Sequence, residues 1–152
     1  NLFSHNSPMQ PNGYNQEEMK MVHETHKIWG QPDGSKQTGV SATCVRVPVM
    51  RAHAVAVNLT LAAPLTADAA RDLLAAAQGV SLIADSEASR FPTPRDAEGQ
   101  DAVLVGRIRP DPTRERGLSF FLSGDQLRKG AALNAVQIAE HLVRAVPAGS
   151  SA

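Results

Sequence analysis

The stretch CVRVPVMRAHAVAVNLTL (residues 44–61) holds two apolar segments that meet near a proline. In HAVAVNLTLA (53–62), apolar residues alternate with small or polar ones, which is the period of a strand with one buried face. The preceding segment GVSATCVRVPV (39–49) is rich in β-branched residues and predicts a second strand. Pro48 lacks a backbone donor and belongs at an edge, an end or a bulge. The stretch therefore predicts two strands that adjoin near Pro48.

The rest of the chain adds helices and further strands. Asn15 can cap the first helix, because Glu18 follows three residues later as a capping-box partner. The predicted elements are an extended segment 1–7, helices at about 15–29, 67–77 and 126–145, strands 80–85, 102–110 and 117–124, and a long loop 86–100. This order favours an α+β fold, in which a mixed, largely antiparallel sheet carries helices on one face.

Length and charge limit the classes of function. A chain of 152 residues is about the size of one domain. Fifteen basic residues balance fifteen acidic ones and the pI is about 7.2, so we expect no nucleic-acid or membrane-surface partner. The sequence shows no apolar run long enough to span a membrane and no signal-peptide pattern, which favours a cytoplasmic protein.

Cys44 is the single cysteine, which excludes an internal disulfide and fits a reducing compartment. Its place in a predicted strand favours a small buried thiol over a reactive one. The first residue is Asn rather than Met, which suggests a trimmed piece or a numbering that starts inside a longer protein. The small, polar tail 146–152 is expected to be frayed.

Arg46 and His53 are polar residues within otherwise apolar segments. If the chain turns or bulges near Pro48, the two side chains can converge on one site. The alternative is two unrelated polar residues at strand ends, each facing water. The residues alone leave both readings open.

Two helices carry further polar groups. Glu17 and Lys20 are three apart on the first helix, where they form either a solvated ion pair or a site for a charged ligand near the helix N-terminus. The last helix combines polar and apolar stripes with many small residues, which suggests close approach of another backbone or a ligand. His23 and His26 lack a third ligand at a suitable spacing, so no metal site is predicted, and no GxGxxG unit, Walker loop or G-x-S-x-G elbow is present.

Four blocks together resemble the C-terminal half of aspartate-semialdehyde dehydrogenase, in that family's order and spacing and over nearly the whole chain: NGYNQEEMKMVHETHKI, SATCVRVPVMRAH, FPTPRDAEGQDAVLVGRIRPD and SGDQLRKGAALNAVQIAEHL. The resemblance implies a domain like the C-terminal domain of glyceraldehyde-3-phosphate dehydrogenase. It also implies a reaction in which NADPH reduces L-aspartyl 4-phosphate to L-aspartate 4-semialdehyde, through a thioacyl intermediate on a Cys. This reaction lies on the route to lysine (through diaminopimelate), threonine, methionine and isoleucine.

By resemblance, each candidate site residue has a role. Glu17 would hold the substrate amino group, Lys20 its phosphate and Arg46 its α-carboxylate. His53 would be the general acid/base, for which an imidazole is suited near neutral pH. A cofactor contact is implied for Gln126 and, more weakly, for Asn134.

The resemblance further implies a division of the chain. Residues 1–125 would form the substrate and dimerisation domain, and the helix 126–145 would pack on an NADP-binding half that precedes this segment and also carries the nucleophilic Cys. Cys44 matches a structural Cys of the family. We expect a homodimer or tetramer that is inactive without that half.

Two alternatives remain. Ala54 and Val55 stand where the family usually has Ser and an acidic residue, which favours a non-catalytic dimerisation module. A related acyl-phosphate reductase, such as the acetylglutamyl-phosphate enzyme, is disfavoured by the EEMK and CVRVPV blocks.

Overall fold

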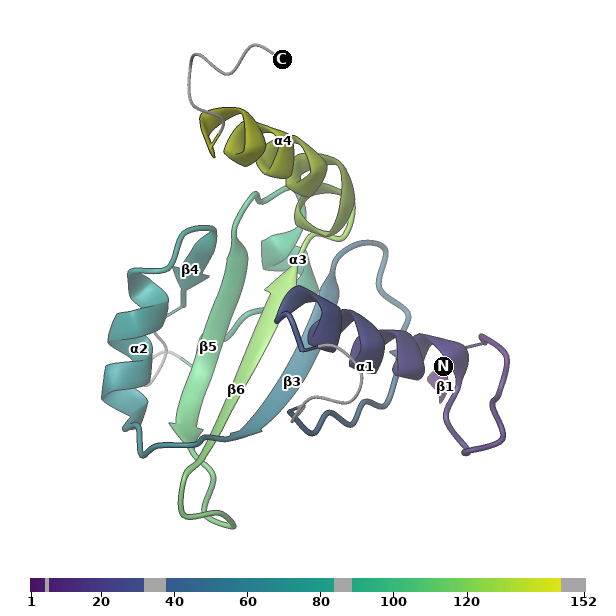
Figure 1. Cartoon of the computed structure of the whole chain (residues 1–152), viewed down its shortest axis with the longest axis horizontal. Coiled ribbons are helices and arrows are strands. Elements are labelled where there is room, and N and C mark those ends of the chain that lie inside the picture. Colours follow the sequence, from purple (N-terminus) through teal and green to yellow (C-terminus); the bar gives the residue numbers. More distant parts are fainter. Residues whose placement is uncertain (5, 32–37, 84–88, 146–152) are drawn as a thin grey trace. The chain divides into compact units, whose positions relative to one another are not determined.

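The computed structural model describes residues 1–4, 6–31, 38–83 and 89–145 (Figure 1). The chain divides into two compact units, Asn1–Pro48 and Val49–Ala152, and each is described by itself. The predicted frayed tail 146–152 lies outside the described residues, as do the last two positions of the predicted strand 80–85.

The first unit is built on helix α1 (Gln16–Ile28). The predicted capping box is confirmed: Asn15 Oδ1 accepts from the Glu18 N–H, and Glu18 Oε2 accepts from the Asn15 N–H, both at 2.9 Å. Strands β1 (Phe3–Ser4) and β2 (Val45–Arg46) pair antiparallel in a two-stranded sheet.

The prediction of a long strand over 39–49 is wrong. Among the described residues, only Val45 and Arg46 of this segment have a strand partner, the two residues of β1. Pro48 falls after β2 has ended, as its missing N–H requires.

The second unit holds a four-stranded sheet in the order β3-β6-β5-β4, made of β3 (His53–Thr60), β4 (Val80–Leu82), β5 (Val103–Pro110) and β6 (Gly117–Gly124). Strands β3, β6 and β5 pair antiparallel and β4 pairs parallel to β5. The predicted α+β class with a mixed, largely antiparallel sheet is confirmed. In the register, His53 lies opposite Gly124, so β3 begins where β6 ends.

The core of this unit lies between the sheet and helix α2 (Ala67–Ala75), which Thr66 caps. Ala70, Val105, Ile108 and Leu118 are its buried members. Leu104 points to the opposite face, as the strand period requires, and packs there with Ala52 and Ala97. Ala97 belongs to α3 (Pro94–Ala97), a single turn capped by Thr93 inside the segment that was predicted as a loop. The sheet therefore carries α2 on one face and this short turn on the other.

A β-bulge interrupts the β5–β6 pairing between Gly106 and Arg109. Arg107 and Ile108 there oppose the single residue Phe120 in β6. Arg107 has φ +58°, in the left-handed region that residues with a Cβ seldom adopt.

The last predicted helix starts later than expected. A π-helical turn, η1 (Arg128–Ala132), precedes α4 (Leu133–Ala145). Its bonds span five residues, with the Gly130 N–H donating to the Asp125 carbonyl at 3.2 Å and the Ala132 N–H to the Leu127 carbonyl at 3.0 Å. In Figure 1, α4 extends beyond one end of the sheet, and it buries none of its residues. None of the helices in the described ranges is long and apolar enough to cross a membrane.

Candidate functional site

His53 opens strand β3 and is exposed. Its carbonyl accepts a hydrogen bond from the buried Ser123 Oγ at 2.7 Å, while β6 pairs alongside. The side chain lies at the rim of a cavity of about 210 Å³ between the end of the sheet and the start of the last helical segment. The residues lining it are His53, Val103, Leu122, Gly124, Asp125, Gln126, Lys129 and Gly130.

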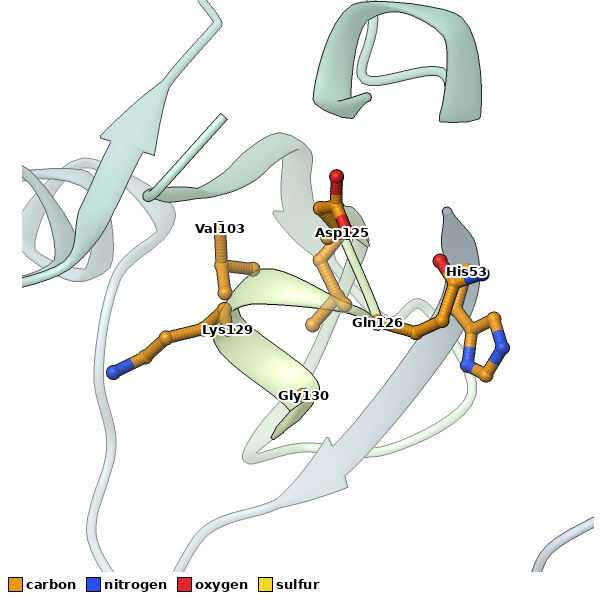
Figure 2. Close-up of a pocket in the computed structure, with 8 residues that line it drawn as sticks. His53, Val103, Asp125, Gln126, Lys129 and Gly130 are labelled. Carbon is orange, nitrogen blue, oxygen red and sulfur yellow. The ribbon is translucent and has the colours of Figure 1, made fainter. Parts of the chain in front are cut away.

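Sequence reasoning placed two of these lining residues, His53 and Gln126, in one functional site, and the structure brings them to one cavity. In Figure 2, His53 and Lys129 lie on opposite sides of the start of the last helical segment, and their side chains point away from each other. His53 and Lys129 therefore line the same cavity from different elements, β3 and the last helical segment.

Two side chains from the end of β6 hold the residues just before His53. Gln126 Oε1 accepts a hydrogen bond from the Ala52 N–H at 2.6 Å. Asp125 Oδ2 accepts from Arg51 Nη2 at 2.7 Å. Ala52 is buried and has φ +71°, so a residue with a Cβ occupies the left-handed region directly before the candidate general acid/base.

Asp125 is fully buried and accepts four hydrogen bonds. Besides Arg51, its donors are the backbone N–H groups of Gly99, Leu127 and Arg128, at 2.8, 2.9 and 3.1 Å. Burial raises the pKa of this carboxyl, but the bonds from the three N–H groups and from Arg51 outweigh burial and lower the pKa to about 2. The Asp125 carboxylate thus connects three parts of the unit by hydrogen bonds: the loop after α3, the start of the last helical segment, and Arg51.

In the first unit, the structure brings Glu17 and Lys20 together. Lys20 Nζ lies 3.5 Å from Glu17 Oε1, and the two side chains are 54% and 36% exposed. A pair this accessible contributes little to stability and leaves both charges open to a ligand. Arg46, in β2, is also exposed. It belongs to a different unit from His53, so the predicted convergence of these two side chains stays a prediction.

Sequence reasoning treated Glu18 only as a cap, whereas the structure shows it joining two segments. Its second carboxylate oxygen, Oε1, accepts from the Cys44 N–H at 2.9 Å, and the side chain is buried. The capping box thereby anchors the segment that leads to Arg46, two residues further on. The long separation from Glu18 to Cys44 left no signal in the sequence.

Cys44 is partly buried rather than fully buried. Burial raises the pKa of its thiol, and the negative charges of Glu18 and Glu17 raise it further. A thiol with a raised pKa is a weak nucleophile, which agrees with the structural role that the resemblance implies for it.

Asn134, the weaker candidate for cofactor binding, lies near the start of α4. Its Oδ1 accepts from Lys129 Nζ at 3.2 Å, and Gln137 Oε1 accepts from the same amine at 2.7 Å. The amide nitrogen of Asn134 has no partner among the described residues and can donate to a ligand. Sequence reasoning missed Lys129, which bonds across five and eight residues of the last helical segment.

The two histidines of α1 belong to no group of three possible metal ligands among the described residues. His26 Nε2 lies 2.7 Å from the Thr38 carbonyl, which connects the helix to the segment after it. Throughout the described ranges, no group of three His, Cys, Asp or Glu residues is arranged to hold a metal ion.

Comparison with known proteins identifies the family. The family model "Semialdehyde dehydrogenase, dimerisation domain" matches residues 1–129. Aspartate-semialdehyde dehydrogenases from Synechocystis sp. and Prochlorococcus marinus are 57% and 50% identical over 143 residues, which cover 94% of this chain. The matched part is 41% and 40% of those relatives, so the chain spans about two-fifths of their length.

A solved structure agrees with the sequence comparisons. The crystal structure of aspartate semialdehyde dehydrogenase II from Vibrio cholerae, complexed with ASA, has a TM-score of 0.85 and 45% identity to this chain. The likeness covers 95% of this chain and 41% of that one. On the extent of the family match, the chain belongs to the semialdehyde dehydrogenase dimerisation-domain family.

Proposed function

We propose that this chain is the substrate-binding and dimerisation part of an aspartate-semialdehyde dehydrogenase. The complete enzyme would reduce L-aspartyl 4-phosphate with NADPH to L-aspartate 4-semialdehyde and release phosphate. The observation that carries this proposal is the family match over residues 1–129, which spans all the candidate site residues except Asn134.

The substrate has three charged groups, and the candidate residues offer a partner for each. The planar fork of Arg46 suits the α-carboxylate, to which it can donate two hydrogen bonds. The carboxylate of Glu17 suits the α-ammonium group, and Lys20 is a compact charge for the phosphate. The exposure of all three side chains supports this proposal, because a ligand can reach them.

His53 is proposed as the general acid/base. Its imidazole would accept the proton of the nucleophilic thiol as the thiolate attacks the acyl phosphate, and would return a proton later in the cycle. The thiol would belong to the other half of the enzyme, since the Cys44 thiol has a raised pKa. The exposure of His53 at a cavity rim supports access from that half.

The residues of this chain fit one edge of an NADP molecule rather than the whole. The cavity of about 210 Å³ is too small to enclose a dinucleotide. The side-chain oxygen of Gln126 accepts from the Ala52 N–H, so its amide nitrogen can still donate a hydrogen bond to the cofactor. When bound, NADPH would supply the hydride. This chain would contribute Gln126 and, more weakly, the amide nitrogen of Asn134.

Residues 126–145 are proposed to pack on the NADP-binding half. Val136, Ile138, Leu142 and Val143 on α4 are 53–75% exposed, which is unfavourable for large apolar side chains in water. A Cβ added at Gly130 would meet nothing nearer than 3.5 Å, so packing within this unit does not require a glycine there. Both observations support the proposal that another protein surface, the NADP-binding half, packs on residues 126–145.

A chimera tests the function directly. The matching segment of the Synechocystis relative is replaced by this chain, and NADPH-dependent turnover of aspartyl phosphate is measured. We expect activity in the chimera and none in the isolated chain. Conversion of His53 to Ala should abolish turnover, whereas the matched change His23→Ala, at an exposed position of α1, should not. An inactive but folded chimera would favour the non-catalytic module.

Assembly is tested separately by sedimentation of the chimera, for which we expect a dimer or tetramer. Turnover of acetylglutamyl phosphate in preference to aspartyl phosphate would instead support the related reductase.

A further inference from the structure

The imidazole of His53 makes no hydrogen bond to the described residues of its own unit. The two residues that follow it, Ala54 and Val55, have no polar side-chain atoms to offer. A catalytic His is usually oriented by a hydrogen bond to its second ring nitrogen. Without such a bond within this unit, the direction of the His53 ring depends on the backbone that carries it.

That backbone is held at three consecutive residues by the end of β6 and the residues after it. Arg51 is bonded to Asp125, the Ala52 N–H to Gln126 and the His53 carbonyl to Ser123, at distances of 2.6–2.7 Å. The middle residue has the least favourable conformation of the three, since Ala52 is in the left-handed region. An extended Ala52 would send the chain, and with it the His53 side chain, in a different direction.

The side-chain amide of Gln126 makes a hydrogen bond through its oxygen and leaves its nitrogen available to a ligand. Oε1 accepts from Ala52, and within the described residues of the unit Nε2 has no partner. Gln126 also lines the cavity at whose rim His53 lies. One side chain thus contacts the backbone before His53 and faces the space that a ligand would enter.

We propose that Gln126 is a positioning residue for His53, which holds Ala52 in its left-handed conformation through Oε1 and couples the direction of the imidazole to a ligand bound at Nε2. The proposal rests on the proposed function for the identity of that ligand, a nicotinamide dinucleotide. It adds a second role to the cofactor contact implied for Gln126.

A matched pair of variants in the chimera separates the two roles. Gln126→Glu keeps an acceptor for the Ala52 N–H but removes the donor, so it should mainly raise the KM for NADPH. Gln126→Met is similar in length but has neither the donor nor a strong acceptor, so it should raise the KM for NADPH as Gln126→Glu does and in addition lower kcat, by about 10–100-fold for an imidazole displaced by about 1 Å.

Rescue at Ala52 distinguishes positioning from general damage. Glycine adopts the left-handed conformation readily, so Ala52→Gly combined with Gln126→Met should recover much of the lost kcat. Ala52→Gly alone is the control for the lost methyl group. The exchange of the Ala52 amide with solvent is a readout that needs no turnover. It should be slow in the parent and in Gln126→Glu, and fast in Gln126→Met.

Several results would overturn the proposal. These are a protected Ala52 amide in Gln126→Met, a Gln126→Met effect on the KM for NADPH alone, or a loss of kcat that Ala52→Gly does not restore. If Gln126→Met does not fold, Gln126→Ser, which is too short to reach Ala52, replaces it with the same expectations. A chimera that is inactive in every form would contradict the proposed function, while amide exchange would still test the hydrogen bond.

Discussion

Glu18 provides the sharpest test of how the first unit holds Arg46, a candidate for substrate binding. Its two carboxylate oxygens accept from the Asn15 and Cys44 N–H groups, and its side chain is 8% exposed. Glu18→Ala removes both acceptors and leaves two N–H groups in a largely buried setting. A hydrogen bond to a charged group contributes about 1.5–3 kcal/mol to stability. The contribution is smaller at the Cys44 N–H, because Cys44 is partly buried and water can replace the lost acceptor. We expect the free energy of unfolding to fall by about 2–4 kcal/mol.

Urea denaturation measures this change, and amide exchange at Cys44 reports it locally. Glu24→Ala is the matched control, because Glu24 is an exposed acid on the same helix. Glu18→Gln should fall between the two, since its amide keeps one acceptor and turns a donor toward the other N–H. In the chimera, Glu18→Ala should also raise the KM for aspartyl phosphate, because Arg46 follows Cys44 by two residues. Equal stability of Glu18→Ala and Glu24→Ala would refute the reasoning.

Three further predictions concern single groups. The pKa of Asp125 is about 2, below the ordinary value near 4, so its stabilising contribution is present above pH 4 and is lost as the pH falls toward 2. Asp125→Asn should therefore be less stable than the parent at pH 7, with a gap that narrows between pH 4 and 2 in denaturation curves. A constant gap would contradict this. Burial and two nearby carboxylates raise the pKa of the Cys44 thiol. The thiol should therefore react with iodoacetamide at pH 8 more slowly in the folded chain than in urea. Cys44→Ser should leave the turnover of the chimera unchanged. Arg107→Gly should raise stability by up to about 1 kcal/mol, since glycine relieves the left-handed conformation at the bulge. The same change at the exposed strand residue Arg109 should lower stability.

Features with a local cause could be predicted from the sequence. The capping box of α1 joins residues three apart and is confirmed. The alternation in 53–62 predicted a strand, which is confirmed over 53–60, but none of its residues is buried in this chain. The sheet class followed from the order of such segments. Each of these signals lies within a few residues of the structure it specifies.

Features that depend on distant partners could not be predicted. Of the strand expected over 39–49, two residues pair, with the two-residue strand β1. The length of a partner strand depends on residues outside the segment, so the segment itself does not indicate it. The hydrogen bond from Ala52 to Gln126 spans 74 positions in the chain, and the left-handed φ of Ala52 has no glycine to signal it. Asp125 reads as an ordinary polar residue before a helix, although it is fully buried with four donors.

In each unit, taken by itself, the candidate site residues are exposed or partly exposed side chains on a backbone that is fixed elsewhere. Glu17, Lys20 and Arg46 are exposed side chains on elements that are anchored elsewhere, by Glu18 and by strand pairing. His53 is likewise exposed, while Ala52, Ser123 and Asp125 beside it are buried. In each unit hydrogen bonds fix the backbone beside these residues, while their charged or polar head groups stay accessible. Exposed charged groups are hydrated and common on protein surfaces, so exposure alone does not identify a site. A backbone that is already fixed nevertheless lets such groups bind a ligand with little further loss of freedom. The exposed large apolar residues of α4 are a different case, because water does not compensate their exposure, and they support the proposal that a further protein surface covers this helix.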